Sequence, residues 1–188
     1  MILPIYLYDH PVLRQKTKPV TEITPELRKL ARDMLETMYA ARGIGLAANQ
    51  VGVSLQLIVV DIGEEEMKQP LILLNPTLVA VSEETAEMEE GCLSLPELRD
   101  VVVRPAAVQV RYTDLRGRER QLEADGLLAR VLQHEIDHLQ GIYFVDRLPA
   151  VRRLFLRRKL ERIARGEVVP PYPVVFGTDT VAQAPKVI

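Results

Sequence analysis

Two histidines spaced four positions apart are the residues of this sequence with the clearest chemical meaning. His134 and His138 stand in the run LLARVLQHEIDHLQG, with Glu135 directly after the first of them. On a helix, this spacing places both imidazoles on one face, where they can bind the same divalent ion. A neighbouring glutamate can move the proton of a water molecule activated by that ion. Two histidines rarely complete a metal site, so a third ligand is expected elsewhere, unless both are ordinary core residues of an apolar helix.

Three residues are candidates for the third ligand. Cys92, in EMEEGCLSLPE, is the single cysteine and lies in a predicted turn after a strand. A thiolate is a strong ligand for zinc or ferrous iron, and the alternative role for Cys92 is that of a small buried hydrophobe. Glu161 follows the histidine motif but stands among arginines, which favours a solvated ion pair. His10 lies next to Pro11, in a context typical of a surface turn.

A third stretch, ARGIGLAANQVG at residues 41–52, combines glycines and small residues with the polar Gln50. It precedes a predicted hydrophobic strand. Taken alone, this pattern is typical of a loop packed closely against a helix, and it indicates a function only weakly.

Three helices are predicted to position these stretches. Each has apolar residues at helical spacing or a capping residue at its start, and each is followed by a glycine that can end a helix. A proline marks the start of the first and the third. The predicted ranges are 25–42 between Thr24 and Gly43, 126–140 between Asp125 and Gly141, and 150–165 between Pro149 and Gly166.

The middle of the chain is rich in β-forming residues. The runs LQLIVVDIG, PLILLNPTLVAVS, VVVRPAAVQVRYTD and RERQLEA predict strands, and DLRG predicts a hairpin turn between the last two. Helices on both sides of these runs indicate the α+β class. We expect mixed or antiparallel sheets around a central metal-binding helix, with further helices towards the two ends. Residues 1–166 are expected to form one catalytic domain, and the Pro- and Val-rich residues 167–188 an extended tail.

Length and charge exclude several classes of protein. A chain of 188 residues can bury a core without disulfides. Its 24 basic and 26 acidic residues give a net charge of −2, so no general attraction to membranes or nucleic acid is expected, and no specific DNA binding. The N-terminus does not resemble a signal peptide, and no apolar run approaches the roughly 20 residues that span a bilayer. With a single cysteine, these features predict a cytoplasmic protein.

The three stretches together resemble the signature motifs of the peptide deformylase family, G-x-G-x-A-A-x-Q, E-G-C-x-S and H-E-x-D-H. They stand here as GIGLAANQ at 43–50, EGCLS at 90–94 and HEIDH at 134–138, in the family's order. The resemblance covers the chain up to the third predicted helix. It implies a metal-dependent hydrolase that removes the N-formyl group from the N-terminal methionine of newly synthesised polypeptides and releases formate.

The resemblance also implies a role for individual residues. It implies that Glu135 moves the water proton, and that the Gln50 side chain and the backbone N–H of Leu93 donate to the oxyanion. The metal is implied to be ferrous iron in the cell, with zinc or nickel as substitutes after purification. The implied ligands are Cys92, His134 and His138.

Substrate contacts follow from the same resemblance. Backbone groups near Ile44, Gly45 and Gly91 are implied to pair with the substrate as an added strand. Apolar residues including Ile44, Leu128 and Val131 are implied to line the methionine pocket.

Arg130 departs from the family pattern, because related enzymes often carry an apolar residue there. Two further arginines, Arg99 and Arg104, follow the cysteine motif; Arg104 is a candidate partner for Asp137, the alternative being a solvated surface position.

Two other readings of the sequence stay open. In the first, the chain is a zincin-like peptidase that uses Glu161 as third ligand and leaves Cys92 structural. In the second, it is a non-catalytic metal module that docks on ribosomal RNA through the basic helix at 150–165. Between positions 152 and 165 seven basic residues face one acid, so ribosome contact is also predicted if the chain is a deformylase.

Overall fold

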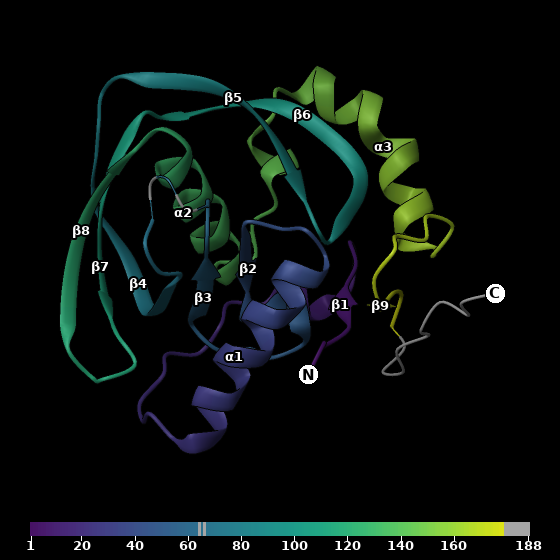
Figure 1. The fold of residues 1–188 in the computed structure, drawn as a ribbon. Helices are drawn as coiled ribbons and strands as arrows, with labels where there is room; N and C mark the ends of the chain where they lie inside the picture. Colours follow the sequence, from purple (N-terminus) through teal and green to yellow (C-terminus); the bar gives the residue numbers. More distant parts are fainter. Residues whose placement is uncertain (64, 66, 179–188) are drawn as a thin grey trace.

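The computed structural model describes residues 1–63, 65 and 67–178 (Figure 1). It contains three α-helices and nine strands in that part of the chain, which confirms the predicted α+β class. The helices are α1 (Pro25–Ala40), α2 (Gly126–Leu139) and α3 (Ala150–Ala164). The strands are β1 (Ile5–Tyr6), β2 (Gly45–Ala47), β3 (Leu57–Val60), β4 (Leu71–Val81), β5 (Thr85–Cys92), β6 (Leu95–Pro105), β7 (Ala107–Thr113), β8 (Glu119–Asp125) and β9 (Val174–Val175).

The strands form three sheets around α2. Five strands pair antiparallel in the order β2-β3-β4-β7-β8, β5 pairs antiparallel with β6, and the short β1 and β9 run parallel. Figure 1 shows α2 near the centre, enclosed by the curved larger sheet and the β5–β6 hairpin. Every residue of α2 from Ala129 to Leu139 is buried. This arrangement confirms the prediction of sheets packed around a central helix.

The three helices start where predicted, and each ends one or two residues earlier than predicted. The Thr24 hydroxyl oxygen accepts a hydrogen bond from the backbone N–H of Leu27 at 3.1 Å, as expected at a helix start. The predicted end of this helix at residue 42 is wrong, because α1 stops at Ala40. Arg42, with a φ of 59°, takes the left-handed conformation common at helix ends, one residue before the predicted stop at Gly43.

Several strands differ from the predicted runs. The run at 101–114 is divided between β6 and β7, which separate at Ala106. The four strands β1, β2, β5 and β9 were not predicted. Three of these have only two or three residues, and β5 carries acidic residues at alternate positions, which lowers its β-propensity.

The predicted C-terminal tail is extended in its described part but is firmly packed. Val174 and Val175 form β9 beside β1, and both are buried. Residues 179–188, the end of the predicted tail, lie outside the described residues. Within the part of the chain that the structure describes, no helix is long and apolar enough to cross a membrane.

Candidate metal centre

The structure brings the three predicted ligands into one group. His134 and His138 extend from the same face of α2, and Cys92 ends β5 at the turn into β6. The Cys92 Sγ lies 3.2 Å from His138 Nε2, and one ligand atom from each of the three residues lies within 4.8 Å of the others. Among the described residues, this is the only group of three such side chains that could hold one ion.

The donor atoms of this group fit a divalent transition metal. His134 Nδ1 lies 2.8 Å from Glu90 Oε1, and a proton shared there leaves Nε2 free as a ligand. Burial lowers the pKa of His138 well below its usual value, which favours the neutral imidazole that binds metals. One thiolate and two imidazoles suit zinc or ferrous iron.

The other candidate ligands lie outside this group. Glu161 is exposed on α3, where its Oε1 accepts from Arg157 Nε at 3.3 Å. His10 accepts a hydrogen bond at Nδ1 from the Val12 backbone N–H. The geometry therefore gives the zincin-like alternative no third ligand at Glu161.

Glu135 occupies a buried position beside the histidines. Its side-chain Oε2 has no hydrogen-bond partner among the described residues. Burial raises the pKa of Glu135 to about 7, against the opposing effect of His134. Gly45 passes so close that a Cβ placed on it would lie 2.6 Å from Glu135 Oε1 and 2.8 Å from Val131 Cγ1. The second glycine of the first motif is therefore required by its close approach to Glu135.

Gln50 connects the first motif to the second. Its Oε1 accepts from the Ala47 backbone N–H at 2.9 Å, which fixes the orientation of the amide. The Nε2 then donates to Ser94 Oγ at 3.1 Å and lies 3.5 Å from Cys92 Sγ. An adjacent buried amide, Asn49, donates from Nδ2 to the His138 main-chain oxygen at 2.6 Å. The three motifs are thus joined by direct hydrogen bonds.

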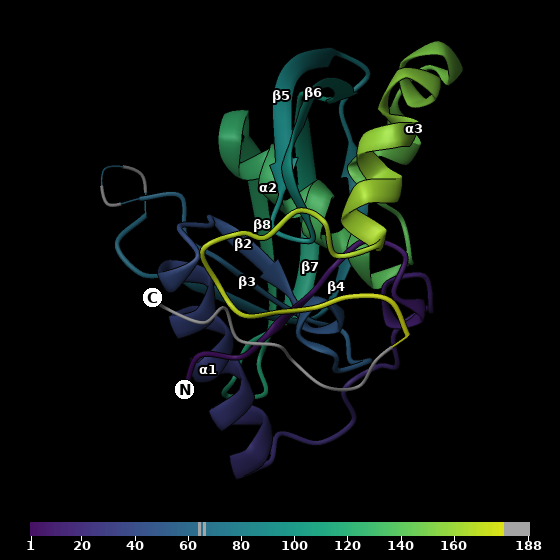
Figure 2. The same cartoon turned by 90° about the vertical axis from the view of Figure 1, so that its right-hand side faces the viewer.

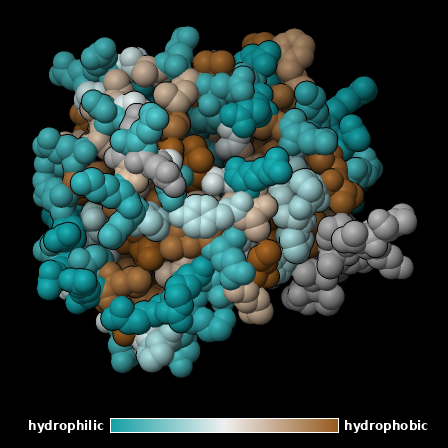
Figure 3. Space-filling model, viewed as in Figure 1, coloured by the Kyte–Doolittle hydropathy of each residue, from teal (hydrophilic) through white to brown (hydrophobic). Residues whose placement is uncertain are grey.

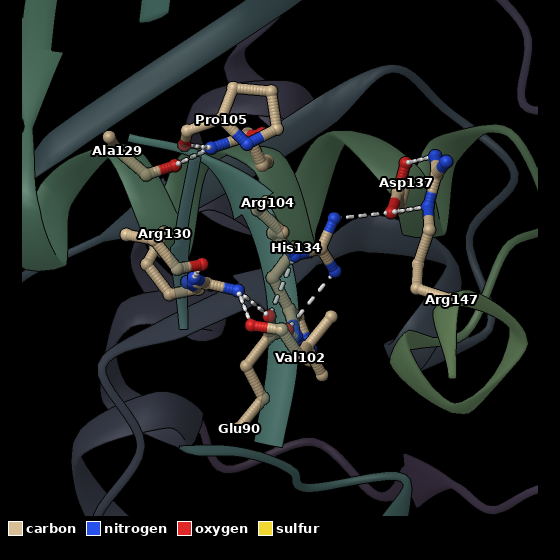
Figure 4. Close-up of polar contacts among 11 residues, drawn as sticks. Glu90, Val102, Arg104, Pro105, Ala129, Arg130, His134, Asp137 and Arg147 are labelled. Atoms are coloured by element: carbon tan, nitrogen blue, oxygen red, sulfur yellow. Dashed lines mark hydrogen bonds and ion pairs between the residues drawn. The ribbon is translucent and has the colours of Figure 1, made fainter. Parts of the chain in front are cut away.

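A buried ionic network supports the ligand helix (Figure 4). Glu90 accepts from Arg104 Nε at 2.6 Å and from Arg130 Nη1 at 2.8 Å, besides its contact with His134. Arg104 also donates to Asp137 Oδ2 at 2.8 Å, which confirms the predicted pair and excludes a solvated position. Burial alone would raise the pKa of Glu90, but hydrogen bonds from His134 and Arg104 lower it to about 2. Glu90 is therefore charged.

Sequence reasoning gave Glu90 no role, although the second motif contains it. A histidine that binds a metal usually donates its second N–H to a carboxylate or a carbonyl. That rule, applied to an acid two positions before the cysteine, is the signal that could have identified Glu90. Arg130 is explained by the same network, because its guanidinium also donates to the Val102 and Ala86 main-chain oxygens.

The Glu90→Gln variant is expected to be less stable by about 3–5 kcal/mol, because Arg104 and Arg130 would lose their shared buried counter-charge. Its metal affinity should fall by about 10- to 100-fold, because His134 loses its carboxylate partner. Urea unfolding and chelator competition measure the two effects. The matched control is Glu89→Gln, whose exposed pair with Arg99 contributes at most about 1 kcal/mol. Equal stability of the two variants would contradict the role given to the network.

A cavity of about 620 Å³ opens beside the metal group. The predicted substrate residues Ile44, Gly45, Gly91 and Val131 line it, together with His134 and Glu135. Leu128, which was predicted for the methionine pocket, does not line this cavity. Leu128 packs against the core of the larger sheet, and Leu127 lines the cavity instead, because consecutive helical residues differ in direction by about 100°. Residues 169–172 also line the cavity, which no pattern in the sequence predicted.

Comparison with known proteins agrees with this site. A family model for polypeptide deformylase matches residues 2–154. A peptide deformylase from Salinibacter ruber is 50% identical, over 95% of this chain and 97% of its own length. The peptide deformylase structure from Thermus thermophilus is 45% identical, with a TM-score of 0.82 over 89% of this chain and 100% of its own. The structure from Legionella pneumophila is 43% identical, with a TM-score of 0.81 over 89% of this chain and 98% of its own.

The fold and the cysteine–histidine group place the chain among metal-dependent hydrolases. The family match covers most of the chain, and a relative with half of its residues identical extends over nearly all of it. The chain belongs to the polypeptide deformylase family and is an enzyme.

Proposed function

We propose that Cys92, His134 and His138 hold the ion with which this peptide deformylase works. The enzyme removes the N-formyl group from the N-terminal methionine of newly synthesised polypeptides and releases formate. The observation that carries the ligand assignment is the meeting of one sulfur and two imidazoles in a single group, beside a buried glutamate. When bound, a divalent ion supplies a Lewis acid that polarises the formyl carbonyl and lowers the pKa of water.

Glu135 moves the proton in this proposal. Its buried carboxylate accepts a proton from the attacking water and passes it to the amine nitrogen that leaves. The free Oε2 and the raised pKa support this role, since an exchange of protons near neutral pH needs a carboxyl group that can exist in both forms.

Gln50 and Leu93 stabilise the oxyanion in the same proposal. The Gln50 amide already presents its NH₂ group to Cys92 and Ser94, because its oxygen is held by Ala47. The backbone N–H of Leu93 lies directly after the cysteine ligand. Donors that are fixed in advance stabilise developing negative charge without reorganisation.

The substrate peptide is proposed to add a strand to β2. This strand is at the edge of the larger sheet, with β3 on one side and the cavity on the other. Backbone groups near Gly45 and, across the cavity, near Gly91 would pair with the peptide main chain, so that residues beyond methionine need not have fixed side chains. The methionine side chain would contact Ile44, Leu127 and Val131.

The metal in the cell is proposed to be ferrous iron, with zinc or nickel as substitutes. A thiolate and two imidazoles bind all three ions, so the donor set supports the proposal without selecting among them. Ferrous iron beside a thiolate would make the enzyme sensitive to oxygen.

The function is tested by offering the anaerobically purified enzyme formyl-Met-Ala-Ser and acetyl-Met-Ala-Ser. We expect formate from the first peptide and no acetate from the second, because a formyl carbon carries only hydrogen and fits where a methyl group does not. Release of acetate at a comparable rate would contradict the proposed shape of the site.

Contact with the ribosome is proposed through the basic face of α3. All seven basic residues between positions 152 and 165 are exposed. Arg153, Arg158 and Lys159 form no ion pair within the described residues, and Leu154 and Phe155 are 69% and 72% exposed beside them. Figure 3 shows brown hydrophobic surface among teal side chains at the upper right, where Figure 1 places α3. The exposed cations of this surface can neutralise RNA phosphates.

Replacing Arg153, Arg158 and Lys159 with alanine is expected to weaken ribosome binding. The association constant for the ribosome should also depend less steeply on salt: the slope of its logarithm against log salt should become less negative by about 2 to 3, since three phosphate contacts are lost. The matched control replaces Arg111, Arg116 and Arg118, which lie on and around the β7–β8 hairpin, with alanine. Binding that is equally weakened in both triple variants, or that does not depend on salt, would contradict the proposal.

A further inference from the structure

The chain beyond α3 forms one side of the catalytic cavity. Residues 169–172, here called the C-terminal wall, line it together with Gly43, Cys92 and Leu93. Figure 2 shows the chain after α3, in yellow, crossing the molecule and then returning below its own path; the wall is part of this stretch. The polypeptide deformylase model ends at residue 154, so the wall lies outside the part of the chain that the family match covers.

The C-terminal wall is anchored by buried side chains and a backbone hydrogen bond. Val168, just before the wall, and Pro170, within it, are buried. Val169 between them is 67% exposed, and this alternation is typical of a chain with one face packed. Beyond the wall, the Ile5 backbone N–H donates to the Pro173 oxygen at 2.8 Å, where the chain joins β1. Two consecutive prolines restrict the backbone further. The side chain of Val169 is therefore presented from a fixed support.

Tyr172 connects the wall to the proposed oxyanion donor. Its hydroxyl donates to the main-chain oxygen of Leu93 at 2.7 Å, and its ring is buried. The next residue, Ser94, is held by the Tyr8 backbone N–H at 2.9 Å and by Gln50. The turn after Cys92 thus has three tethers, and Tyr172 supplies the one on Leu93 itself.

The separation of Tyr172 and Val169 along the chain is comparable with the length of a short substrate. Three residues of extended chain span about 10 Å. A peptide whose formyl group lies at the metal ligands places its second and third residues about 7–10 Å away. Tyr172 contacts Leu93 beside the ligands, and Val169, three residues earlier in the chain and so within about 10 Å of it, lines the same cavity.

We propose that the C-terminal wall is part of the substrate site. Tyr172 is a positioning residue that fixes the Leu93 peptide, and Val169 contacts the substrate residues that follow methionine. The inference rests on the proposed function, because it uses the same cavity and the same donor.

A charge exchange at Val169 tests the contact. Val169→Asp and Val169→Lys are measured at low salt with formyl-Met-Ala-Lys amide, formyl-Met-Ala-Glu amide and formyl-Met amide. We expect kcat/KM to rise about two- to five-fold for the oppositely charged peptide and to fall by a similar factor for the like-charged one. The short formyl-Met amide should be converted equally by both variants, because it does not reach residue 169.

The matched control is the same pair of substitutions at Val151, which is 64% exposed on α3 and does not line the cavity. No dependence on peptide charge in the Val169 variants, or the same dependence in the Val151 variants, would overturn the contact. Failure of the proposed function looks different, since the unsubstituted enzyme would then release no formate from any of the three substrates.

Tyr172→Phe tests the positioning role, because it removes only the hydroxyl group. We expect kcat for formyl-Met amide to fall about two- to ten-fold, as for one lost hydrogen bond, with KM unchanged within about two-fold. Tyr112→Phe, which removes a hydroxyl from β7 away from the cavity, should leave both constants unchanged. A Tyr172→Phe enzyme with unchanged kcat, or with a raised KM as its main defect, would overturn the role.

Discussion

Glu135→Gln is expected to reduce kcat for formate release by about two to four orders of magnitude while the metal content stays unchanged. Glutamine has nearly the same shape as glutamate, so the buried position beside His134 is preserved. It cannot accept and return a proton, and the transfer from water to the leaving amine is lost. Steady-state kinetics with a formyl-Met peptide, together with metal analysis of the same samples, measures both quantities.

The control for this variant is Glu87→Gln, the same substitution at an exposed position of β5. It should have the activity of the unsubstituted enzyme. Glu135→Gln with normal turnover would mean that another group moves the proton. Loss of the ion in this variant would mean instead that Glu135 contributes to binding the metal.

Cys92→Ser is expected to lose both metal and activity. A serine hydroxyl is not deprotonated near neutral pH and is a far weaker ligand than a thiolate. The fall in metal affinity should exceed about 100-fold, the upper end of what loss of a supporting residue costs. Competition with a chelator of known affinity measures it.

Glu161→Gln distinguishes the cysteine ligand from the zincin-like alternative. Because Glu161 is exposed and paired with Arg157, this variant should keep its metal and its activity. Retained metal in Cys92→Ser combined with loss in Glu161→Gln would reverse the assignment.

The parts of this site that the sequence predicts are those set by local spacing. The interval between His134 and His138 is enough to place both on one helical face, and a cysteine is a strong metal ligand wherever the chain brings it. Thr24 marks the start of α1 because its cap needs only the next three residues. Three short motifs were therefore sufficient to indicate the family.

The remaining parts depend on contacts between distant segments. Arg130 and Glu90 are 40 positions apart, and only the packing of α2 against β5 makes them partners. Whether Leu127 or Leu128 lines the cavity depends on how α2 is rotated about its axis against the larger sheet. The residues of α2 alone do not determine this rotation. Tyr172 has no local signal at all, because its partner Leu93 is 79 positions away.

The ligand assignment is tested most directly by purifying the enzyme without oxygen, measuring its metal content and following formate release from a formyl-Met peptide. We predict about one ferrous ion per chain, as expected for a single three-ligand site. Formate release should be lost on chelation and restored by adding ferrous iron, but not in Cys92→Ser. Full formate release from metal-free enzyme, or none with any divalent ion, would contradict the account.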